Sequence, residues 1–214
     1  MRLLTSLCVV LFLAVAPPAP AQAPSRDAAL AALKSADAGQ REHAAEQLAK
    51  IGRMADVPAL LAALRDSDED VRTVAEEAIW VIWSRSGDAQ VDKLFAQALG
   101  AMNEGRYPES IATFSQVIER KPDFAEGWNK RATLYFLTGQ FENSLKDCDE
   151  VIKRNPTHFG ALAGYGQIYL QLHDFEKALY YFKRALAVNP NMDGVALQIQ
   201  ILERVLETPG KNKA

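Results

Sequence analysis

Few side chains in this sequence have the types and spacing that a catalytic or metal site needs. The three histidines, His43, His158 and His173, form no His-x-x-x-His or Glu-x-x-His pair of metal ligands. The phosphate-binding pattern Gly-x-x-x-x-Gly-Lys and the nucleophile pattern Gly-x-Ser-x-Gly do not occur in the sequence either. The residues therefore predict no enzyme, no catalytic residue, no metal and no cofactor.

Two further features could be taken for chemistry and have simpler interpretations. The acidic run from Asp66 to Asp70 lacks the glycine that a calcium loop carries at its sixth position, so we interpret it as a solvated, helix-capping turn. Cys148 falls at a core position of a predicted helix, and no histidine follows it with matching periodicity. We expect it to be a small buried hydrophobic residue.

Composition limits the class of protein. The chain has 214 residues, 49% of them hydrophobic, and a formal net charge of −3. A disordered tail would be poorer in apolar residues, and a disulfide-stapled miniprotein would be richer in cysteine. Nucleic-acid binding usually requires a basic stripe, which a near-neutral chain does not offer. We therefore expect a folded protein without a nucleic-acid partner.

Residues 1–23 have the pattern of a secretory signal peptide. Arg2 precedes an apolar run that ends at Pro17, and the run is too short to cross a bilayer. Small residues at Ala19, Ala21 and Ala23 offer two cleavage sites. We expect export, to a periplasm or alternatively to the medium, and a mature chain without a membrane span.

The sequence repeats every 34 residues from Val91 onward. A glycine-x-aromatic step recurs at Gly105 and Gly139, with His173 in the glycine position of the third copy, and a proline closes each copy. The period predicts three helix pairs at 91–124, 125–158 and 159–192, followed by a capping helix and tail at 193–214. This pattern resembles the tetratricopeptide repeat (TPR) family.

A second, shorter repeat lies in residues 24–90. Leu30 to Lys34 matches Leu61 to Arg65, and an Asp-x-x-x-Arg turn follows in both copies. This pattern resembles a pair of HEAT-like repeats, in which the aspartate caps a helix and the arginine braces the turn or its neighbour. The expected fold is thus an all-α, right-handed α-solenoid of two HEAT-like pairs, three TPR pairs and a capping helix.

Trp80 and Trp83 are expected to join the two halves. They replace the small residues Ala49 and Gly52 of the first short repeat, and large aromatic side chains at helical spacing are more often core than ligand platform. We expect them to pack against the first TPR helix. Gly160, Gly164 and Gly166 lie inside a predicted helix, where they indicate close helix approach and a locally looser helix.

The TPR resemblance implies a ligand-binding groove lined by the first helix of each repeat. Its contact positions correspond here to Phe95, Leu99, Met102, Asn103, Asn129, Lys130, Thr133, Phe136, Gln167 and Gln171. The apolar members could equally pack inside their own repeats. The lysine, asparagine and arginine set that the family uses for acidic chaperone tails is replaced by Phe95, Leu99, Gly160 and Gly164, with Lys130 as the cation that remains.

We therefore expect an exported protein-interaction module, a scaffold or assembly factor, that binds a protein or peptide segment in the groove. The alternative is a structural subunit that self-associates through its terminal helix or HEAT-like face. Leu197 and Ile201 widen the apolar stripe of that helix beyond what one seam requires.

Overall fold

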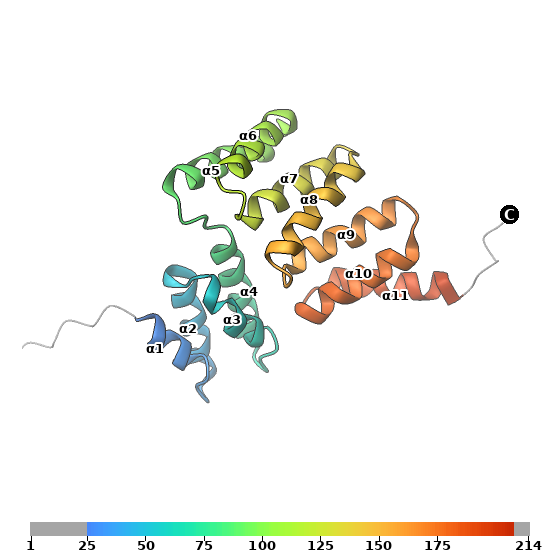
Figure 1. Ribbon diagram of the computed structural model, residues 1–214. Coiled ribbons are helices and arrows are strands. Elements are labelled where there is room, and N and C mark those ends of the chain that lie inside the picture. The colour runs from blue at the N-terminus through green and yellow to red at the C-terminus, as the bar shows by residue number, and fades with distance from the viewer. Residues whose placement is uncertain (1–24, 208–214) are drawn as a thin grey trace, which may run out of the picture.

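The computed structural model describes residues 25–207, which form helices joined by short turns (Figure 1). This range contains no strand, and the order of its helix pairs confirms the predicted all-α solenoid. The predicted signal peptide and the last seven residues lie outside the described residues.

The N-terminal unit, residues 25–83, consists of α1 (Arg26–Ala32), α2 (Ala38–Ile51), the 3-10 turn η1 (Met54–Asp56), α3 (Val57–Ala63) and α4 (Glu69–Trp83). Its turns work as their residue types predict. The Asp37 carboxylate caps α2 by accepting from the Gln40 amide, and Asp68 caps α4 in the same way. The Arg41 guanidinium donates two hydrogen bonds of 2.7 Å to Asp66 and so braces the next turn.

The three predicted TPR pairs follow. Their helices are α5 (Ala89–Asn103), α6 (Tyr107–Arg120), α7 (Ala125–Leu137), α8 (Phe141–Arg154), α9 (Phe159–Gln171) and α10 (Phe175–Val188). Within the first two pairs, a buried serine of the second helix donates 2.7 Å to a carbonyl of the first, from Ser110 to Ala98 and from Ser144 to Ala132. The third pair has Ala178 at that position and closes through Gly166, where an added Cβ would lie 2.4 Å from the Phe182 ring. The close approach predicted for Gly166 is confirmed.

The turn between the two helices of each repeat contains one residue in the left-handed region. Its φ is 74° at Gly105, 72° at Gly139 and 57° at His173. A side chain disfavours this conformation, so His173 adopts at some cost the geometry that glycine provides freely in the other two repeats.

The helix α11 (Asp193–Glu207) covers the end of the third repeat. Val195, Ile199 and Leu202 are buried against it, in a cluster shared with α9 and α10. Leu197 and Ile201 remain 56% and 44% exposed. Val195, Ile199 and Leu202 therefore cap the array, whereas Leu197 and Ile201 face solvent.

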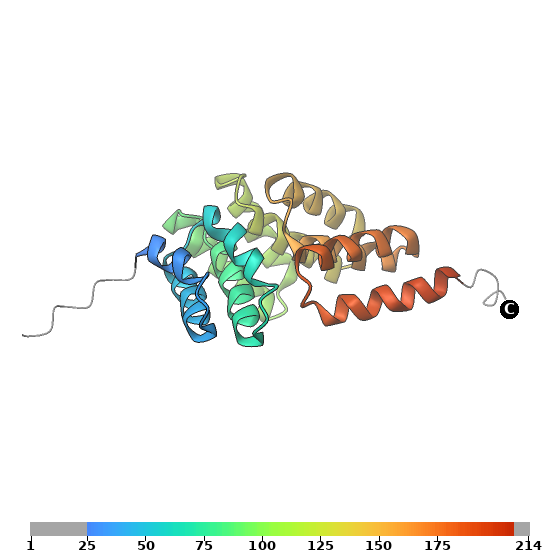
Figure 2. The same cartoon turned by 90° about the horizontal axis from the view of Figure 1, so that it is seen from below.

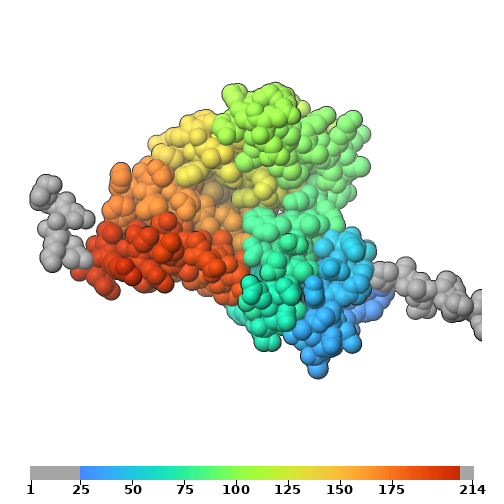
Figure 3. Space-filling model, turned by 180° about the vertical axis from the view of Figure 1, so that it is seen from behind, coloured from blue at the N-terminus to red at the C-terminus, as the bar shows by residue number. Residues whose placement is uncertain are grey.

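The N-terminal unit does not pack through its tryptophans against the first TPR helix, so that expectation is wrong. Trp83 belongs to a cluster that is completed from the repeats by Phe159, Val188 and Met192, and among the described residues no side chain of α5 joins it. The turn before α4 also contacts the turn before α11, where the Asn191 amide donates 2.8 Å to the Leu64 carbonyl. Figures 2 and 3 show this unit lying against the orange and red C-terminal helices. The chain thus folds back, and its N-terminal part rests on the third repeat.

Candidate functional site on the concave face of the repeats

A pocket of about 180 Å³ lies between the first helices of the second and third repeats, α7 and α9. Four of the ten predicted groove residues line it together: Asn129, Thr133, Phe136 and Gln167. We call this space the groove pocket. Because α7 and α9 run side by side, residues 34 or 38 positions apart in the sequence are brought to one surface.

The groove pocket offers both apolar surface and hydrogen-bonding groups. Its wall includes Phe136, whose ring lies 5.9 Å from that of Phe141, and the small residues Gly160 and Gly164. The Thr133 hydroxyl donates 3.0 Å to the Asn129 carbonyl and can still accept a hydrogen bond. Gln167 is half-buried at the edge. Such a wall suits an extended backbone, whose polar groups alternate with side chains.

Cys148 also lines the groove pocket, but it has no nucleophilic character. Burial raises the pKa of its thiol to about 12. A thiol in that state holds its proton near neutral pH, and the thiolate is the reactive form. Cys148 is buried, as its sequence position predicted.

The other predicted groove residues lie apart from this pocket. The Phe95 ring is 4% exposed and packs 5.5 Å from Phe114 and 5.3 Å from Phe124. Leu99 and Met102 are half-buried against the same first-repeat cluster. Asn103 and Gln171 are exposed at the ends of α5 and α9. For Phe95 the structure therefore favours the packing role that the sequence left open.

Lys130 belongs to a buried charge network. Its ammonium lies 3.0 Å from the Glu126 carboxylate, whose side chain is fully buried. The other carboxylate oxygen of Glu126 lies 2.9 Å from Nε2 of His158. His158 Nδ1 accepts from the Ala161 amide, so Nε2 carries the proton and donates to Glu126.

The electrostatics of this network keep Glu126 charged. Burial alone would raise the pKa of its carboxyl, and it is the largest single influence. The hydrogen bond from His158 and the charge of Lys130 together outweigh burial and hold the pKa below its usual value. Lys130 therefore neutralises a buried carboxylate inside the protein.

Trp80 reaches the same network from the N-terminal unit. The Lys130 ammonium lies 5.6 Å from the centre of the Trp80 ring, within cation–π range. The Trp80 ring also meets Phe159 edge-on at 5.1 Å. A Cβ at Gly160 would lie 2.5 Å from Trp80 Cη2, so only glycine leaves room for the indole. Thus Trp80 of α4 covers the groove positions of Lys130 and Gly160.

A signal for this contact is present in the sequence. Gly160 stands at a groove position where the family has a side chain, and Trp80 stands where the earlier repeat has the small residue Ala49. The space that Gly160 leaves on α9 is complementary to the bulky Trp80 side chain on α4. Nothing in the spacing alone pairs them, because 80 residues separate the two positions.

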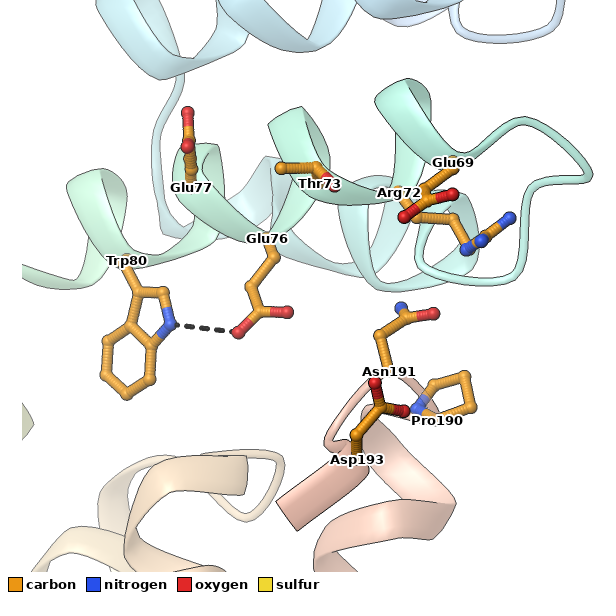
Figure 4. A pocket seen from close by; sticks show the side chains of 9 residues that line it. All are labelled: Glu69, Arg72, Thr73, Glu76, Glu77, Trp80, Pro190, Asn191 and Asp193. Carbon is orange, nitrogen blue, oxygen red and sulfur yellow. Dashed lines mark hydrogen bonds between the residues drawn. The ribbon is translucent and has the colours of Figure 1, made fainter. Parts of the chain in front are cut away.

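A second pocket, of about 350 Å³, lies where α4 faces the turn before α11 (Figure 4). Its lining is largely acidic and includes Glu69, Glu76 and Asp193, with Arg72 as a cation. Glu76 and Trp80 extend from the same side of α4, and the Trp80 indole donates 3.4 Å to Glu76. Across residues 25–207, no group of three or more histidine, cysteine or acidic side chains could hold a metal ion.

Comparison with known proteins identifies the repeats. Residues 123–191 match the tetratricopeptide repeat family. A TPR repeat-containing protein of Rhizobium etli is 32% identical over 142 residues, which make up 66% of this chain and 70% of that protein. The chain belongs to the TPR family. The Hsp70-Hsp90 organizing protein 1 of Glycine max is 28% identical over 42% of this chain, a stretch that spans only 16% of that longer protein.

Solved TPR structures share the fold. The first TPR of Spaghetti (RPAP3) bound to an HSP90 peptide superposes with a TM-score of 0.54 and 21% identity, over 56% of this chain and 97% of the other. The Sgt2 TPR domain from Aspergillus fumigatus gives a TM-score of 0.53 and 20% identity, over 56% and 81%. The TPR fold is a protein-interaction fold. No helix within residues 25–207 is long and apolar enough to cross a membrane.

Proposed function

We propose that this TPR protein is an exported interaction module that binds an extended segment of another protein in the groove pocket between α7 and α9. The observation that carries the proposal is the meeting of Asn129, Thr133, Phe136 and Gln167 around a space of about 180 Å³. The first TPR of Spaghetti (RPAP3) is bound to an HSP90 peptide, and the TPR2B domain of yeast Sti1 is in a complex with pHsp70. Binding a peptide is therefore a role that this fold can perform.

The chemistry of the partner segment differs from an acidic tail. The groove pocket presents amide, hydroxyl and aromatic groups, and its nearest cation, Lys130, already pairs with Glu126 at 3.0 Å. A charged tail would meet no free cation among these groups. We therefore propose a segment with small or apolar side chains, held through its backbone.

Export is proposed on the leader pattern at residues 1–23. We place the mature protein in a periplasm, where it acts as a scaffold or assembly factor, and we retain the HEAT-like resemblance for residues 24–90. N-terminal sequencing of the chain recovered outside the cytoplasm should begin after Ala21 or Ala23. A chain that stays inside and keeps Met1 would contradict export and leave the groove proposal intact.

Site-specific photo-cross-linking tests the groove. A photoreactive amino acid replaces Gln167 at the groove pocket or, as the matched control, Gln116, an exposed residue of α6 outside it. We expect an adduct with one defined partner at 167 and none at 116. The Thr133→Lys variant fills the pocket, so it should weaken that partner's binding at least about tenfold. Equal adducts at both positions would refute the groove as the binding face.

The exposed stripe on α11 supports the second candidate, self-association. Leu197, Ile201 and Val205 lie on one face of the helix and are 56%, 44% and 41% exposed. An apolar row of this kind can pair with a second copy. Light scattering across a concentration series tests this candidate. If the protein self-associates through α11, its mass should rise with concentration, Ile201→Glu should abolish that rise, and Thr133→Lys should leave it unchanged. A concentration-independent mass in the unaltered protein would exclude this candidate.

A further inference from the structure

A third pocket, of about 190 Å³, lies below the repeat turns and outside the groove. It is formed where the segment after α4 crosses the turns that precede α7 and α9. Its walls contain three cationic residues, Arg85, Lys121 and Arg154, and two acidic ones, Asp123 and Glu126. We call it the junction pocket.

Two buried N–H groups on the lining residues have no hydrogen-bond partner within the described chain. They are Nε1 of Trp83 and Nδ2 of Asn155, whose residues are 3% and 6% exposed. Leaving a buried donor unpaired costs about 1–3 kcal/mol, so such groups are uncommon and call for an acceptor.

The surroundings fix both groups as donors. The Trp83 ring stacks on His158 with 4.3 Å between centroids, and an indole N–H can only donate. The Asn155 Oδ1 accepts from both the amide and the hydroxyl of Thr157, at 3.3 and 3.0 Å. That fixes the orientation of the amide and leaves Nδ2 as its free end.

The charge around the junction pocket indicates the class of acceptor. Each guanidinium offers five N–H donors, and Arg85 donates to the carbonyls of Ala49 and Gly52. Arg154 is paired with Glu150, and the Lys121 ammonium lies 3.7 Å from the Asp123 carboxylate, which is exposed. The buried acid in the wall, Glu126, is already compensated by His158 and Lys130. Two unpaired donors beside Arg85, which has no carboxylate partner among residues 25–207, and Lys121, whose ion pair is long and solvent-exposed, suit an oxyanion.

We propose that the junction pocket is an anion-binding site that takes a carboxylate or similar oxyanion. The space of about 190 Å³ equals roughly six water volumes, enough for a carboxylate and a short carbon chain. Trp83 and Asn155 donate to the oxyanion, and Arg85 and Lys121 supply the charge. The site lies away from the groove pocket, so it stands whether or not peptide binds there.

The three indole N–H resonances of the 15N-labelled protein give a direct test. Trp80 and Trp128 already donate, at 3.4 Å to Glu76 and 3.0 Å to the Pro122 carbonyl, so they are internal controls. The probes are acetate, inorganic phosphate, and a blocked pentapeptide with one central glutamate or, instead, glutamine. All are titrated at constant ionic strength.

We expect a saturable shift of the Trp83 resonance alone. Saturation by acetate or phosphate but not by the peptide identifies a free anion, and saturation by the glutamate peptide but not its glutamine form identifies a side chain. Lys121→Gln should weaken binding about fivefold, whereas Lys153→Gln, the same change at a residue outside the pocket, should not.

Either of two results would overturn the proposal. One is a Trp83 resonance unmoved by every probe, which would mean that water satisfies the donors. The other is a parallel, non-saturating drift of all three indoles, which would be a general salt effect. Asn155→Asp, which converts the donor end into an acceptor, should abolish binding. Asn189→Asp is its control, because Asn189 occupies the equivalent turn of the third repeat outside this pocket.

Discussion

Adding a single methyl group at Gly160 tests how the N-terminal unit sits on the repeats. In Gly160→Ala the new Cβ would lie 2.5 Å from Trp80 Cη2, about 1 Å inside the normal carbon–carbon separation of roughly 3.5–4.0 Å. The indole cannot swing away freely, because Phe159 and Trp83 meet it edge-on at 5.1 and 5.3 Å. Overpacking of this kind costs about 1–3 kcal/mol.

An opposing effect makes the prediction sharper. Alanine is favoured over glycine inside a helix by about 0.5–1 kcal/mol. The net change for Gly160→Ala is therefore a loss of about 0–2.5 kcal/mol, centred near 1 kcal/mol. The control is Gly164→Ala in the same helix, where the new Cβ would meet only Cys148 Sγ at an ordinary 3.8 Å. That variant should gain about 0.5 kcal/mol from the helix preference alone.

A double-mutant cycle then isolates the contact. Trp80→Ala removes a half-buried indole and should cost about 3 kcal/mol. In that background the clash is gone, so Gly160→Ala should become neutral or stabilising. The coupling between positions 80 and 160 should be about 2 kcal/mol, well above the few tenths expected for independent sites.

Urea unfolding followed by circular dichroism measures these free energies. The unaltered protein should unfold in one transition, since Trp83, Phe159 and Val188 share one cluster. If Gly160→Ala changes stability equally with and without Trp80, the two residues do not touch. A separate early transition that carries the whole Trp80→Ala effect would show that the N-terminal unit folds apart from the repeats.

Three further predictions concern the repeats themselves. His173→Gly should stabilise the protein by about 1 kcal/mol in thermal melts, because His173 has a φ of 57°; a loss would refute the strain. The Asp147 side chain is 5% exposed and accepts two hydrogen bonds of 2.8 Å from Arg131. Arg131→Met leaves this carboxylate buried and unpaired, so it should cost about 3 kcal/mol, and adding Asp147→Leu should recover part of that loss. If the effects of the two substitutions simply add, the pairing is contradicted. Because the folded pKa of Glu126 is depressed, its contribution is present above its ordinary pKa of 4.5 and is lost as pH falls through the folded value. Acid titration of Glu126→Gln should therefore show a shallower fall in stability than the parent, and identical curves would refute this.

Local features of the sequence predicted the repeats well. The period of 34, the closing prolines and the turn glycines each report on a few neighbouring residues, and the structure places one helix pair in each copy. The capping role of Asp37 and Asp68 was predicted because a cap needs only the next turn of chain. These inferences succeeded because periodicity is set by local geometry.

The sequence pattern did not predict which side chains of distant elements contact each other. The 34-residue pattern indicates no partner for Arg131, and in the structure its guanidinium donates to Asp147 on the facing helix. Lys130 looked like a groove cation, and its charge is already used by Glu126. His158 carried no visible signal for burial, yet it is wholly enclosed between Trp83 and Glu126. For Arg131 and His158 the interaction depends on how the helices pack, and helix packing cannot be read from the spacing of residues along the chain.

The fold-back of the N-terminal unit restricts what the groove can bind. In the second and third repeats, Lys130 and Gly160 face Trp80, and Thr133 and Gln167 line open space. A partner segment therefore has a floor of amide and hydroxyl groups and an end limited by an indole. Gly160 belongs to both surfaces, since it lines the groove pocket and also makes room for Trp80. A bulky residue at position 160 would both displace Trp80 and narrow the groove pocket. The docking of the N-terminal unit and the width of the groove are therefore linked at Gly160.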